Sequence, residues 1–519
     1  MLFIFSKLFY IELTLNKQSN INMLKKEKNI ARLDFFIVLA LISIAFIVRF
    51  IYIGKTDIGN DECFSLYYSR FSALDIMKAL TTGAGFAADN PPLWEIILGV
   101  WTKTFGINLL ALRSLSLLFN VLTIIPLYKL ANEFFSKRIA ISVSLLYVFS
   151  TFSLFLSHEG RVYSLVGFLA ICSVYCFMKQ YRNPSKFNWV LLLVSNVLLV
   201  YSHYMAAFWI IAMEVLTVVI FKDLRKSMRK ALLFHIIGLL VFCFPLIPVV
   251  FERFMDSGLN GTWIKKCTGI EDFYSMLCTF TNAPDTTVLA ITIMVSSLIK
   301  VAISMKSTKL SLSSSLLIVL FWTVPLVASF LLSFLVGFFL NRYFYFTLPL
   351  YLLTLVICIN YLFPKRKLYR IITECIFLLA VIISFKMDSG VMRYAGWKGD
   401  VSKVSDRLIE LKAEKDACVI ISPQWIDKQL VYYFDEEHKV FANEGKLVEP
   451  VFQDYLRTEG YYYEYTYREE DYLRYSDVII VHENLRDISS IVSELEMNGY
   501  KQKDCEMFLQ MSISSFSKK

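Results

Sequence analysis

The sequence predicts an all-α polytopic membrane bundle of about eleven transmembrane helices, followed by a small C-terminal extracytoplasmic α/β domain. Two features of composition support this fold class. Hydrophobic residues make up 56% of the chain and the mean hydropathy is +0.54, whereas soluble domains are roughly 45–50% apolar. Charged residues are sparse within the long apolar runs and become frequent after residue 387. We therefore expect a membrane domain over 33–386 and an α/β domain over 387–519.

The N-terminal segment 1–32 is expected to be cytoplasmic. Its apolar start lacks a small-residue cleavage site, so it does not read as a signal peptide. Met23 is followed by Lys25 and Lys26, directly before the first apolar run, which is the charge pattern of a cytoplasmic flank. Translation could start at Met1 or at Met23.

Apolar runs of about 20 residues, the length that crosses a bilayer, recur along the membrane domain. The predicted spans are 33–53, 110–131, 138–156, 161–180, 187–203, 205–221, 231–251, 286–304, 312–338, 343–363 and 368–386. The run 92–105 is shorter and contains Glu95 and Lys103, so we expect a juxtamembrane helix within a first outer loop, 54–109. With this count every cytoplasmic loop holds a basic cluster, as the positive-inside rule requires.

The distribution of charge and the spacing of the cysteines argue against a nucleic-acid-binding protein and against a cysteine metal site. The net charge of +9 comes from Lys and Arg at the ends of apolar runs, which does not indicate a nucleic-acid partner. The 10 cysteines form neither a CxxC pair nor a metal-binding spacing.

Adjacent carboxylates at Asp61 and Glu62 lie just outside the first span. Such a pair is costly beside a membrane unless it stays in water, pairs with cations or performs chemistry. One acid could serve as a general base while the other binds a cation or metal, or both could lie in a solvated turn. Asp89 and Asn90, ahead of two prolines, could cap the next helix or line a pocket.

Further polar residues fall at the same outer ends of the predicted spans. They are His158, Glu159, Arg161, Tyr163, His203, Tyr204 and Arg342. Arginine and aromatic residues often only anchor a span at the interface, but the planar fork of arginine is also suited to phosphate. Two acids, two arginines and two histidines on one face are better explained by an anionic lipid-linked substrate and an acid–base reaction.

The chain resembles the GT-C glycosyltransferases that use polyprenyl-phosphate sugars, in the branch of the protein O-mannosyltransferase-like enzymes and the lipid A aminoarabinose transferases. The resemblance covers about residues 30–400. The matching segments occur in the order of the family: 61–66, 90–94, 160–165, 201–204 and 342–343. Two departures are Asn90, where relatives often have histidine, and the additional acid Glu159.

The resemblance implies the following roles and partners. Asp61 would be the catalytic base of one inverting step, with Glu62 beside it, and Arg161 and Arg342 would hold the donor phosphate. The donor would be a polyprenyl-phosphate-linked sugar, and the acceptor a glycan, lipid or protein on the outer face of a bacterial plasma membrane. No cofactor is certain; a divalent metal is possible, with Glu62 and Glu159 as candidate ligands.

The tail alternates short helices and strands, which predicts an α/β fold. Helices are expected at 401–411, 425–434 and 485–497, and strands at 418–421 and 477–481. The tyrosine-rich run 461–467 could stack on sugar rings, although packing or an edge strand is the simpler interpretation.

Three other functions fit a membrane protein. An O-antigen polymerase or ligase would be expected to carry its Arg and His in large outer loops. A lipid-linked sugar flippase or transporter would be expected to show internal repeats and charges at mid-bilayer. A membrane scaffold would need no convergent polar residues.

Overall fold

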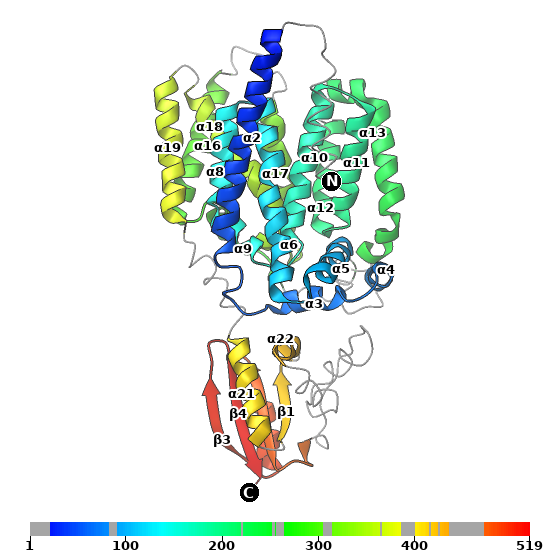
Figure 1. The fold of residues 1–519 in the computed structure, drawn as a ribbon, viewed down its shortest axis with the longest axis vertical. Coiled ribbons are helices and arrows are strands. Elements are labelled where there is room, and N and C mark those ends of the chain that lie inside the picture. Colours follow the sequence, from blue (N-terminus) through cyan, green and yellow to red (C-terminus); the bar gives the residue numbers. More distant parts are fainter. Residues whose placement is uncertain are drawn as a thin grey trace.

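The structure is a computed structural model, and it describes residues 21–81, 91–219, 222–251, 255, 264–304, 314–363, 366–385, 400–414, 417–423, 426–434 and 472–518. A helical bundle forms one part, and a small sheet domain lies beyond one end of it (Figure 1). The predicted fold class, a helical membrane bundle with a small α/β domain, is confirmed. Asp89, Asn90 and the run 461–467 lie outside the described residues.

Helical segments occupy every range that was predicted to span the membrane. These segments are α2 (Ile21–Phe50), α6 (Leu109–Leu122) with α7 (Ile124–Phe134), α8 (Lys137–Val148) with α9 (Thr151–Ser157), α10 (Tyr163–Arg182), α11 (Lys186–Val200), α12 (Tyr204–Val219), α13 (Lys222–Cys243) with η1 (Phe244–Leu246), α16 (Pro284–Ser304), α17 (Ser314–Leu332), η3 (Asn341–Thr347) with α18 (Leu348–Leu362), and α19 (Lys367–Ser384). Seven helices of the described chain are long and apolar enough to cross a membrane, or eight if α8 and α9, bent by 61°, form one span. Helices α11 and α12 are shorter apolar helices.

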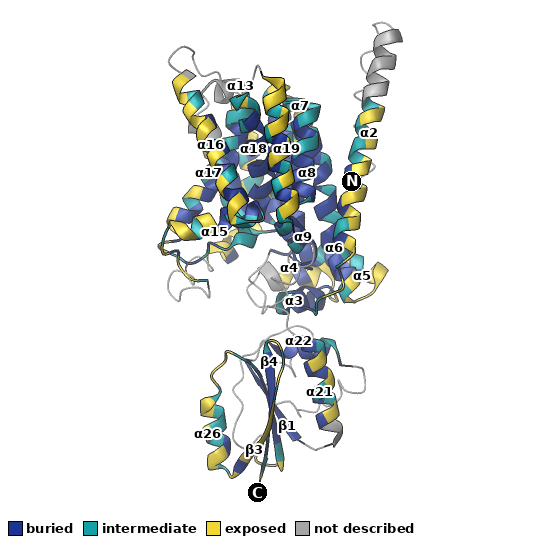
Figure 2. Cartoon of the chain, turned by 90° about the vertical axis from the view of Figure 1, so that its left-hand side faces the viewer, coloured by how far each residue is buried: buried dark blue, intermediate teal, exposed yellow. Residues whose placement is uncertain are grey.

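Burial follows from the position of each helix in the bundle. Helix α10 is largely buried and apolar on all sides, as expected for a central helix. Helices α2, α16 and α19 expose large apolar side chains on the outside of the bundle (Figure 2). A soluble protein rarely exposes so much apolar surface, so this belt is the lipid-facing surface. The chain is therefore a multi-pass membrane protein.

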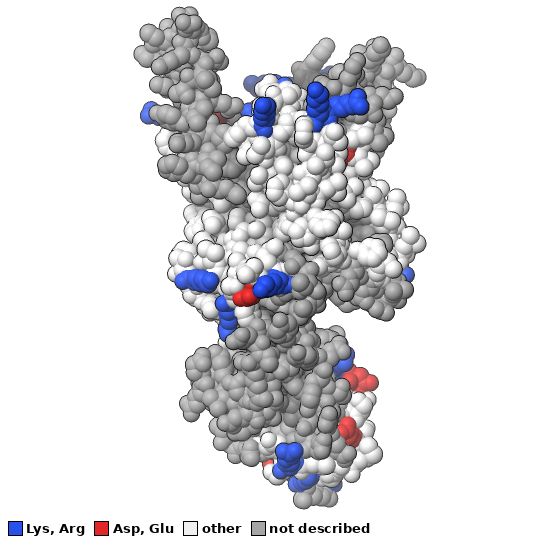
Figure 3. All heavy atoms as spheres, turned by 90° about the vertical axis from the view of Figure 1, so that its right-hand side faces the viewer, with Lys and Arg blue, Asp and Glu red and all other residues white. Residues whose placement is uncertain are grey.

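Three short helices lie at the end of the bundle that is nearer to the sheet domain (Figure 1). They are α3 (Asn60–Tyr68), α4 (Ala73–Thr81) and α5 (Leu93–Phe105). Helix α5 matches the predicted juxtamembrane helix and follows the two prolines. A further short helix, α15 (Ile270–Phe280), precedes α16. Figure 3 shows Lys and Arg side chains at the opposite end of the bundle.

The sheet domain contains four described strands in the order β1-β2-β4-β3. They are β1 (Ala417–Ser422), β2 (Asp477–Glu483), β3 (Tyr500–Met507) and β4 (Met511–Lys518). β1 and β2 are parallel, whereas β4 is antiparallel to both β2 and β3. Helices α21 (Val401–Glu414) and α22 (Asp427–Tyr432) pack on one face, and α26 (Ser489–Met497) packs on the other. β1 and β2 are buried on both faces and were predicted, but β3 and β4 were not, because they are rich in polar residues.

Candidate active site

The candidate site begins at the first turn of α3. Gly59 is the extended N-cap of this helix, and its backbone N–H donates to Oε2 of Glu62 at 2.8 Å. Acids are favoured in a first helical turn because they compensate the exposed N–H groups there. Asp61 and Glu62 both satisfy this preference, yet their side chains have different surroundings.

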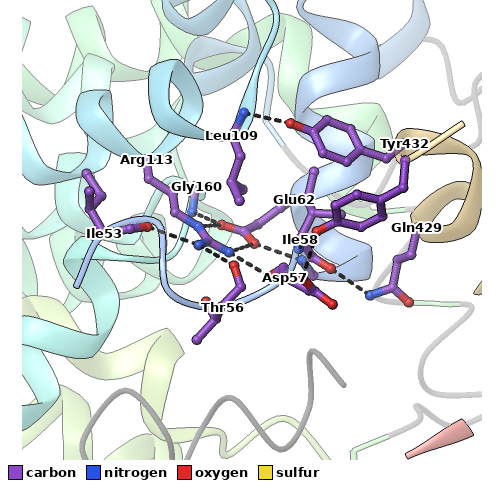
Figure 4. Close-up of polar contacts among 12 residues, drawn as sticks. Ile53, Thr56, Asp57, Ile58, Glu62, Leu109, Arg113, Gly160, Gln429 and Tyr432 are labelled. Carbon is purple, nitrogen blue, oxygen red and sulfur yellow. Dashed lines mark hydrogen bonds and ion pairs between the residues drawn. The ribbon is translucent and has the colours of Figure 1, made fainter. Parts of the chain in front are cut away.

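Glu62 is fully buried and forms an ion pair with Arg113 of α6. The Arg113 guanidinium donates to both carboxylate oxygens, each at 2.9 Å, and the backbone N–H of Gly160 donates to Oε1 at 2.7 Å (Figure 4). A Cβ atom at Gly160 would come within 2.2 Å of the Leu112 side chain, so glycine is required for this close approach. Glu62 therefore ties α3, α6 and the loop before α10 together.

The same Arg113 also holds the chain that leads from α2 to α3. Its guanidinium donates to the carbonyl oxygens of Ile53, Thr56 and Asp57 at 3.0, 2.9 and 2.8 Å (Figure 4). All five N–H groups of an arginine can act as donors, and Arg113 uses its fork to fix one loop and one carboxylate. This residue thus sets where α3 begins.

Asp61 points to a different set of partners. Its Oδ2 lies 3.0 Å from Nη1 of Arg342, at the start of η3, and its side chain is 39% exposed. Nη1 of Arg161 donates to the backbone carbonyl of Asp61 at 2.9 Å. Burial raises the pKa of Asp61, but the charges of Arg342 and Arg161 outweigh it and the net pKa is lowered. Asp61 is therefore an accessible, ionised carboxylate between two cations.

Arg161 is buried and is held by side chains of α3 and α5. Its Nη1 donates to the Ser65 hydroxyl at 2.7 Å and lies 3.8 Å from Oε1 of Glu95. The Ser65 hydroxyl in turn donates to Glu95 at 3.1 Å. Among the described residues, Arg161 Nε and Glu95 Oε2 are buried without a hydrogen-bond partner. The Arg161 guanidinium is thus fixed in orientation through Nη1, while its Nε–H can still donate a hydrogen bond.

Aromatic rings line the side of the cluster near Arg342. The Arg342 guanidinium lies 5.7 Å from the Tyr163 ring and 5.9 Å from the Tyr343 ring, within reach of cation–π attraction. His203 lies 6.0 Å from Tyr163 and 5.2 Å from Tyr343, between ring centroids. Burial, reinforced by the nearby charges of Arg161 and Arg342, lowers the pKa of His203 to about 3. His203 is therefore neutral, and its Nδ1 accepts a hydrogen bond from the backbone N–H of Met205.

The other predicted site residues lie at the margin of this cluster. His158 is buried, and its Nε2 contacts the backbone carbonyl of Arg49 in α2. Glu159 is buried and interacts electrostatically with Arg113 and Arg342. Tyr204 begins α12 and is half-buried.

The candidate metal ligands do not form a metal site. Both oxygens of Glu62 are already used by Arg113 and by two backbone N–H groups, which leaves no lone pair directed at an ion. No group of three His, Cys, Asp or Glu in the described chain has the geometry to hold one. The described residues therefore do not fit a resident divalent ion.

Arg113 was not among the predicted site residues, and Glu95 was predicted only to make the run 92–105 too polar for a span. Arg113 lies near the start of a predicted span, and a charge there usually has a buried partner or a function. The same signal applies to Arg49, which is buried near the end of α2 and donates to Asn120 at 2.6 Å. A charged residue inside an apolar run was thus the sequence feature that could have indicated Arg113.

Glu95 gives a prediction about pH. Burial raises the pKa of Glu95 to about 7, opposed by Arg161 and by the hydrogen bond from Ser65. Below pH 7 the Glu95 carboxyl is protonated, and the positive charge of Arg161 is available to an anionic ligand. Above pH 7 the ionised Glu95 carboxylate attracts the same guanidinium and weakens its attraction for the ligand. We expect the KM for an anionic donor to rise above pH 7 by at most about tenfold per pH unit.

The Glu95→Gln variant tests this prediction, because glutamine can still accept the Ser65 hydrogen bond but cannot ionise. Its KM should stay at the low-pH value across pH 6–9, measured by initial rates. Glu271→Gln, at an exposed acid of α15, is the control and should follow the wild type. A wild-type KM that does not change with pH would contradict the assigned role.

Comparisons with known proteins give a family match and two similar structures. Residues 89–251 match the family described as dolichyl-phosphate-mannose-protein mannosyltransferase. The crystal structure of ArnT from Cupriavidus metallidurans in the apo state is similar over 92% of this chain and 97% of that chain, with TM-score 0.60 and 11% identity. The structure of ArnT from Cupriavidus metallidurans bound to undecaprenyl phosphate gives 0.58 over the same shares, also at 11% identity. No curated protein matches the chain in sequence.

The chain therefore shares the fold of the ArnT structures, and its segment 89–251 matches the mannosyltransferase family. The predicted resemblance to the GT-C glycosyltransferases is confirmed. Arg161 and His203 lie inside the segment matched by the mannosyltransferase family, whereas Asp61 and Arg342 lie outside it.

Proposed function

We propose that this protein transfers a sugar from a polyprenyl-phosphate donor to a glycan, lipid or protein acceptor, with inversion at the anomeric carbon. The observation that supports this most directly is the accessible Asp61, whose carboxylate pairs with the Arg342 guanidinium and whose backbone carbonyl accepts from the Arg161 guanidinium. A base beside two cations suits a reaction in which a proton is removed and a phosphate departs.

In the proposed reaction Asp61 accepts the proton of the acceptor nucleophile. The nucleophile attacks the anomeric carbon from the side opposite the phosphate, and a new bond to the sugar forms. The bond between the anomeric carbon and the phosphate oxygen breaks, and its electron pair leaves with polyprenyl phosphate. Arg161 and Arg342 stabilise the second negative charge that the phosphate gains. Both are aligned before the reaction by their present contacts.

We further propose that the site and the sheet domain face the outside of a bacterial plasma membrane. Basic residues lie at the other end of the bundle, including Lys137 and Lys179, which pair with Asp34 and Glu133. Lys and Arg are enriched on the cytoplasmic side of membrane proteins. A polyprenyl phosphate would place its chain along the apolar surface of the bundle and its headgroup at the site.

Binding of undecaprenyl phosphate by the purified protein, measured by native mass spectrometry, tests the donor site directly. Arg342→Met should weaken binding about 30-fold or more, because a charged hydrogen-bond donor to the phosphate is lost. Arg182→Met, at the opposite end of the bundle, is the matched control and should bind as the wild type does. Equal binding by the Arg342 variant would contradict the phosphate role.

The reaction itself is tested in vesicles that contain a polyprenyl-phosphate-linked radiolabelled sugar in one leaflet, the one that the candidate site faces. Glycosyl transfer predicts that labelled acceptor accumulates and that the donor lipid loses its label. Movement of intact donor between the leaflets without bond formation would support the flippase alternative instead.

A further inference from the structure

The sheet domain contacts the loop that precedes α3. The Tyr433 hydroxyl donates to Oδ1 of Asp57 at 3.1 Å and accepts from the backbone N–H of Ile58 at 3.0 Å. Gln429 Nε2 donates to the carbonyl oxygen of Ile58 at 2.9 Å (Figure 4). Both backbone groups of Ile58 are thus bonded by side chains more than 370 positions away, as the sequence separations of 375 and 371 show. Ile58 lies three positions before Asp61.

A second set of contacts holds the same region. Oδ2 of Asp57 accepts from the backbone N–H and the hydroxyl of Ser402 in α21, at 2.9 and 3.0 Å. The Asp57 carboxylate is therefore hydrogen-bonded by both Ser402 and Tyr433. The Tyr432 hydroxyl accepts from the backbone N–H of Leu109, at the start of α6, at 2.9 Å (Figure 4). The Lys428 ammonium lies 4.7 Å from the centre of the Phe64 ring in α3.

The loop is therefore held between two supports. Arg113 bonds the carbonyl oxygens of Thr56 and Asp57 from the side of the bundle, while Tyr433 and Gln429 bond Ile58 from the side of the sheet domain. Removing either support takes away part of what holds the chain directly before α3. The Asp61 carboxylate itself pairs with Arg342, so Tyr433 and Gln429 act on it through the backbone of Ile58.

Small displacements at such a position have large consequences for rate. A reacting group moved by about 1 Å can lose about 100-fold in rate, even when the substitution lies away from the chemistry. The contacts from the sheet domain are neutral or singly charged hydrogen bonds, and a single bond of this kind contributes only a small part of the stability of a folded protein. Losing one of them should therefore leave the protein folded while loosening the start of α3.

We propose that the α22 side of the C-terminal domain, formed by Gln429, Tyr432 and Tyr433, is a positioning element of the active site that fixes the Asp57–Ile58 loop and thereby the Asp61 carboxylate. This inference rests on the proposed function for its effect on rate. It assigns to the C-terminal domain a role in the transfer step that does not require the domain to touch either substrate.

Tyr433→Phe in the full-length protein is the test, because it removes only the hydroxyl that bonds Asp57 and Ile58. We expect kcat to fall about tenfold or more while the KM for the donor changes less than twofold. The matched control is Tyr500→Phe, which also removes a buried hydroxyl of the sheet domain, one that donates to the carbonyl oxygens of Tyr472 and Tyr475. The control should keep the wild-type kcat. Wild-type kcat in Tyr433→Phe, or an equal fall in Tyr500→Phe, would overturn the proposal.

Hydrogen exchange separates this proposal from the proposed function, because it requires no substrate. Amide exchange in the first turn of α3, including Glu62 and Cys63, should be faster in Tyr433→Phe than in the wild type and unchanged in Tyr500→Phe. Faster exchange together with an inactive wild-type protein would support the positioning contact and contradict the transfer reaction. Unchanged exchange in Tyr433→Phe would overturn the positioning role itself.

Discussion

Replacement of Asp61 by asparagine is expected to lower kcat for glycosyl transfer by about 100-fold to 10,000-fold, the usual contribution of a positioned general base. Asparagine has nearly the same shape and keeps the start of α3, but it cannot accept a proton. The pKa of Asp61 is lowered by Arg342 and Arg161 against the opposing effect of burial. The wild-type base should consequently stay ionised, and kcat should be maintained, down to pH values below the ordinary range of an aspartate.

Binding of undecaprenyl phosphate should not weaken in Asp61→Asn, although the rate of transfer falls. Without the Asp61 charge, Arg342 loses its anionic partner at 3.0 Å and is freed for the phosphate. We therefore expect Asp61→Asn to bind undecaprenyl phosphate as tightly as the wild type, or more tightly. Measuring kcat by label transfer and binding by native mass spectrometry distinguishes a lost base from a lost binding site.

Asp285→Asn is the control for this experiment, since Asp285 is an exposed acid in the first turn of α16. It should transfer sugar at the wild-type rate. Undiminished transfer by Asp61→Asn would remove Asp61 from the mechanism. A parallel fall in the Asp285 variant would instead indicate a general effect of surface charge.

The two adjacent acids show what the sequence could and could not predict. Both were predicted as site residues because they follow a predicted span on its outer side. Successive helical residues point about 100° apart, so one of two neighbours faces the substrate side while the other faces the bundle. Which one does so depends on Arg113, 51 positions from Glu62, and sequence patterns do not reveal that pairing.

The predicted phosphate-binding residues illustrate the opposite case. Arg161 and Arg342 were predicted to meet because each lies where a span reaches the outer face, and alternating spans bring such ends together. The structure places both beside Asp61. His203 joins them for the same reason, at the turn between α11 and α12. Topology alone is sufficient to predict this part of the site.

The contact between the two domains could not be predicted in this way. Asp57, Ile58, Gln429 and Tyr433 have no periodicity or motif that distinguishes them from other loop and helix residues. Their relation depends on how the sheet domain is placed against the bundle, which is a property of the assembled fold. The segment 425–434 was predicted as a helix from its pattern, yet nothing in that pattern indicates which surface it meets.

The second large effect is expected at the buried ion pair of Arg113 and Glu62. Arg113→Met leaves the Glu62 carboxylate fully buried without its cation, which typically costs about 3–5 kcal/mol of stability. The carbonyl oxygens of Ile53, Thr56 and Asp57 lose their donor at the same time. We expect a large decrease in thermal stability in detergent, measured by loss of the monodisperse protein on heating.

A double-mutant cycle shows whether the pair acts as a unit. Glu62→Leu alone should also destabilise the protein, because it leaves the Arg113 charge buried and the N–H groups of Gly59 and Gly160 without their acceptor. Combining it with Arg113→Met removes both charges, and replacing a buried pair by apolar residues is often neutral. The double variant should therefore be less destabilised than the sum of the single variants. Strictly additive losses would contradict the coupling, and with it the role of this ion pair in holding the loop before Asp61.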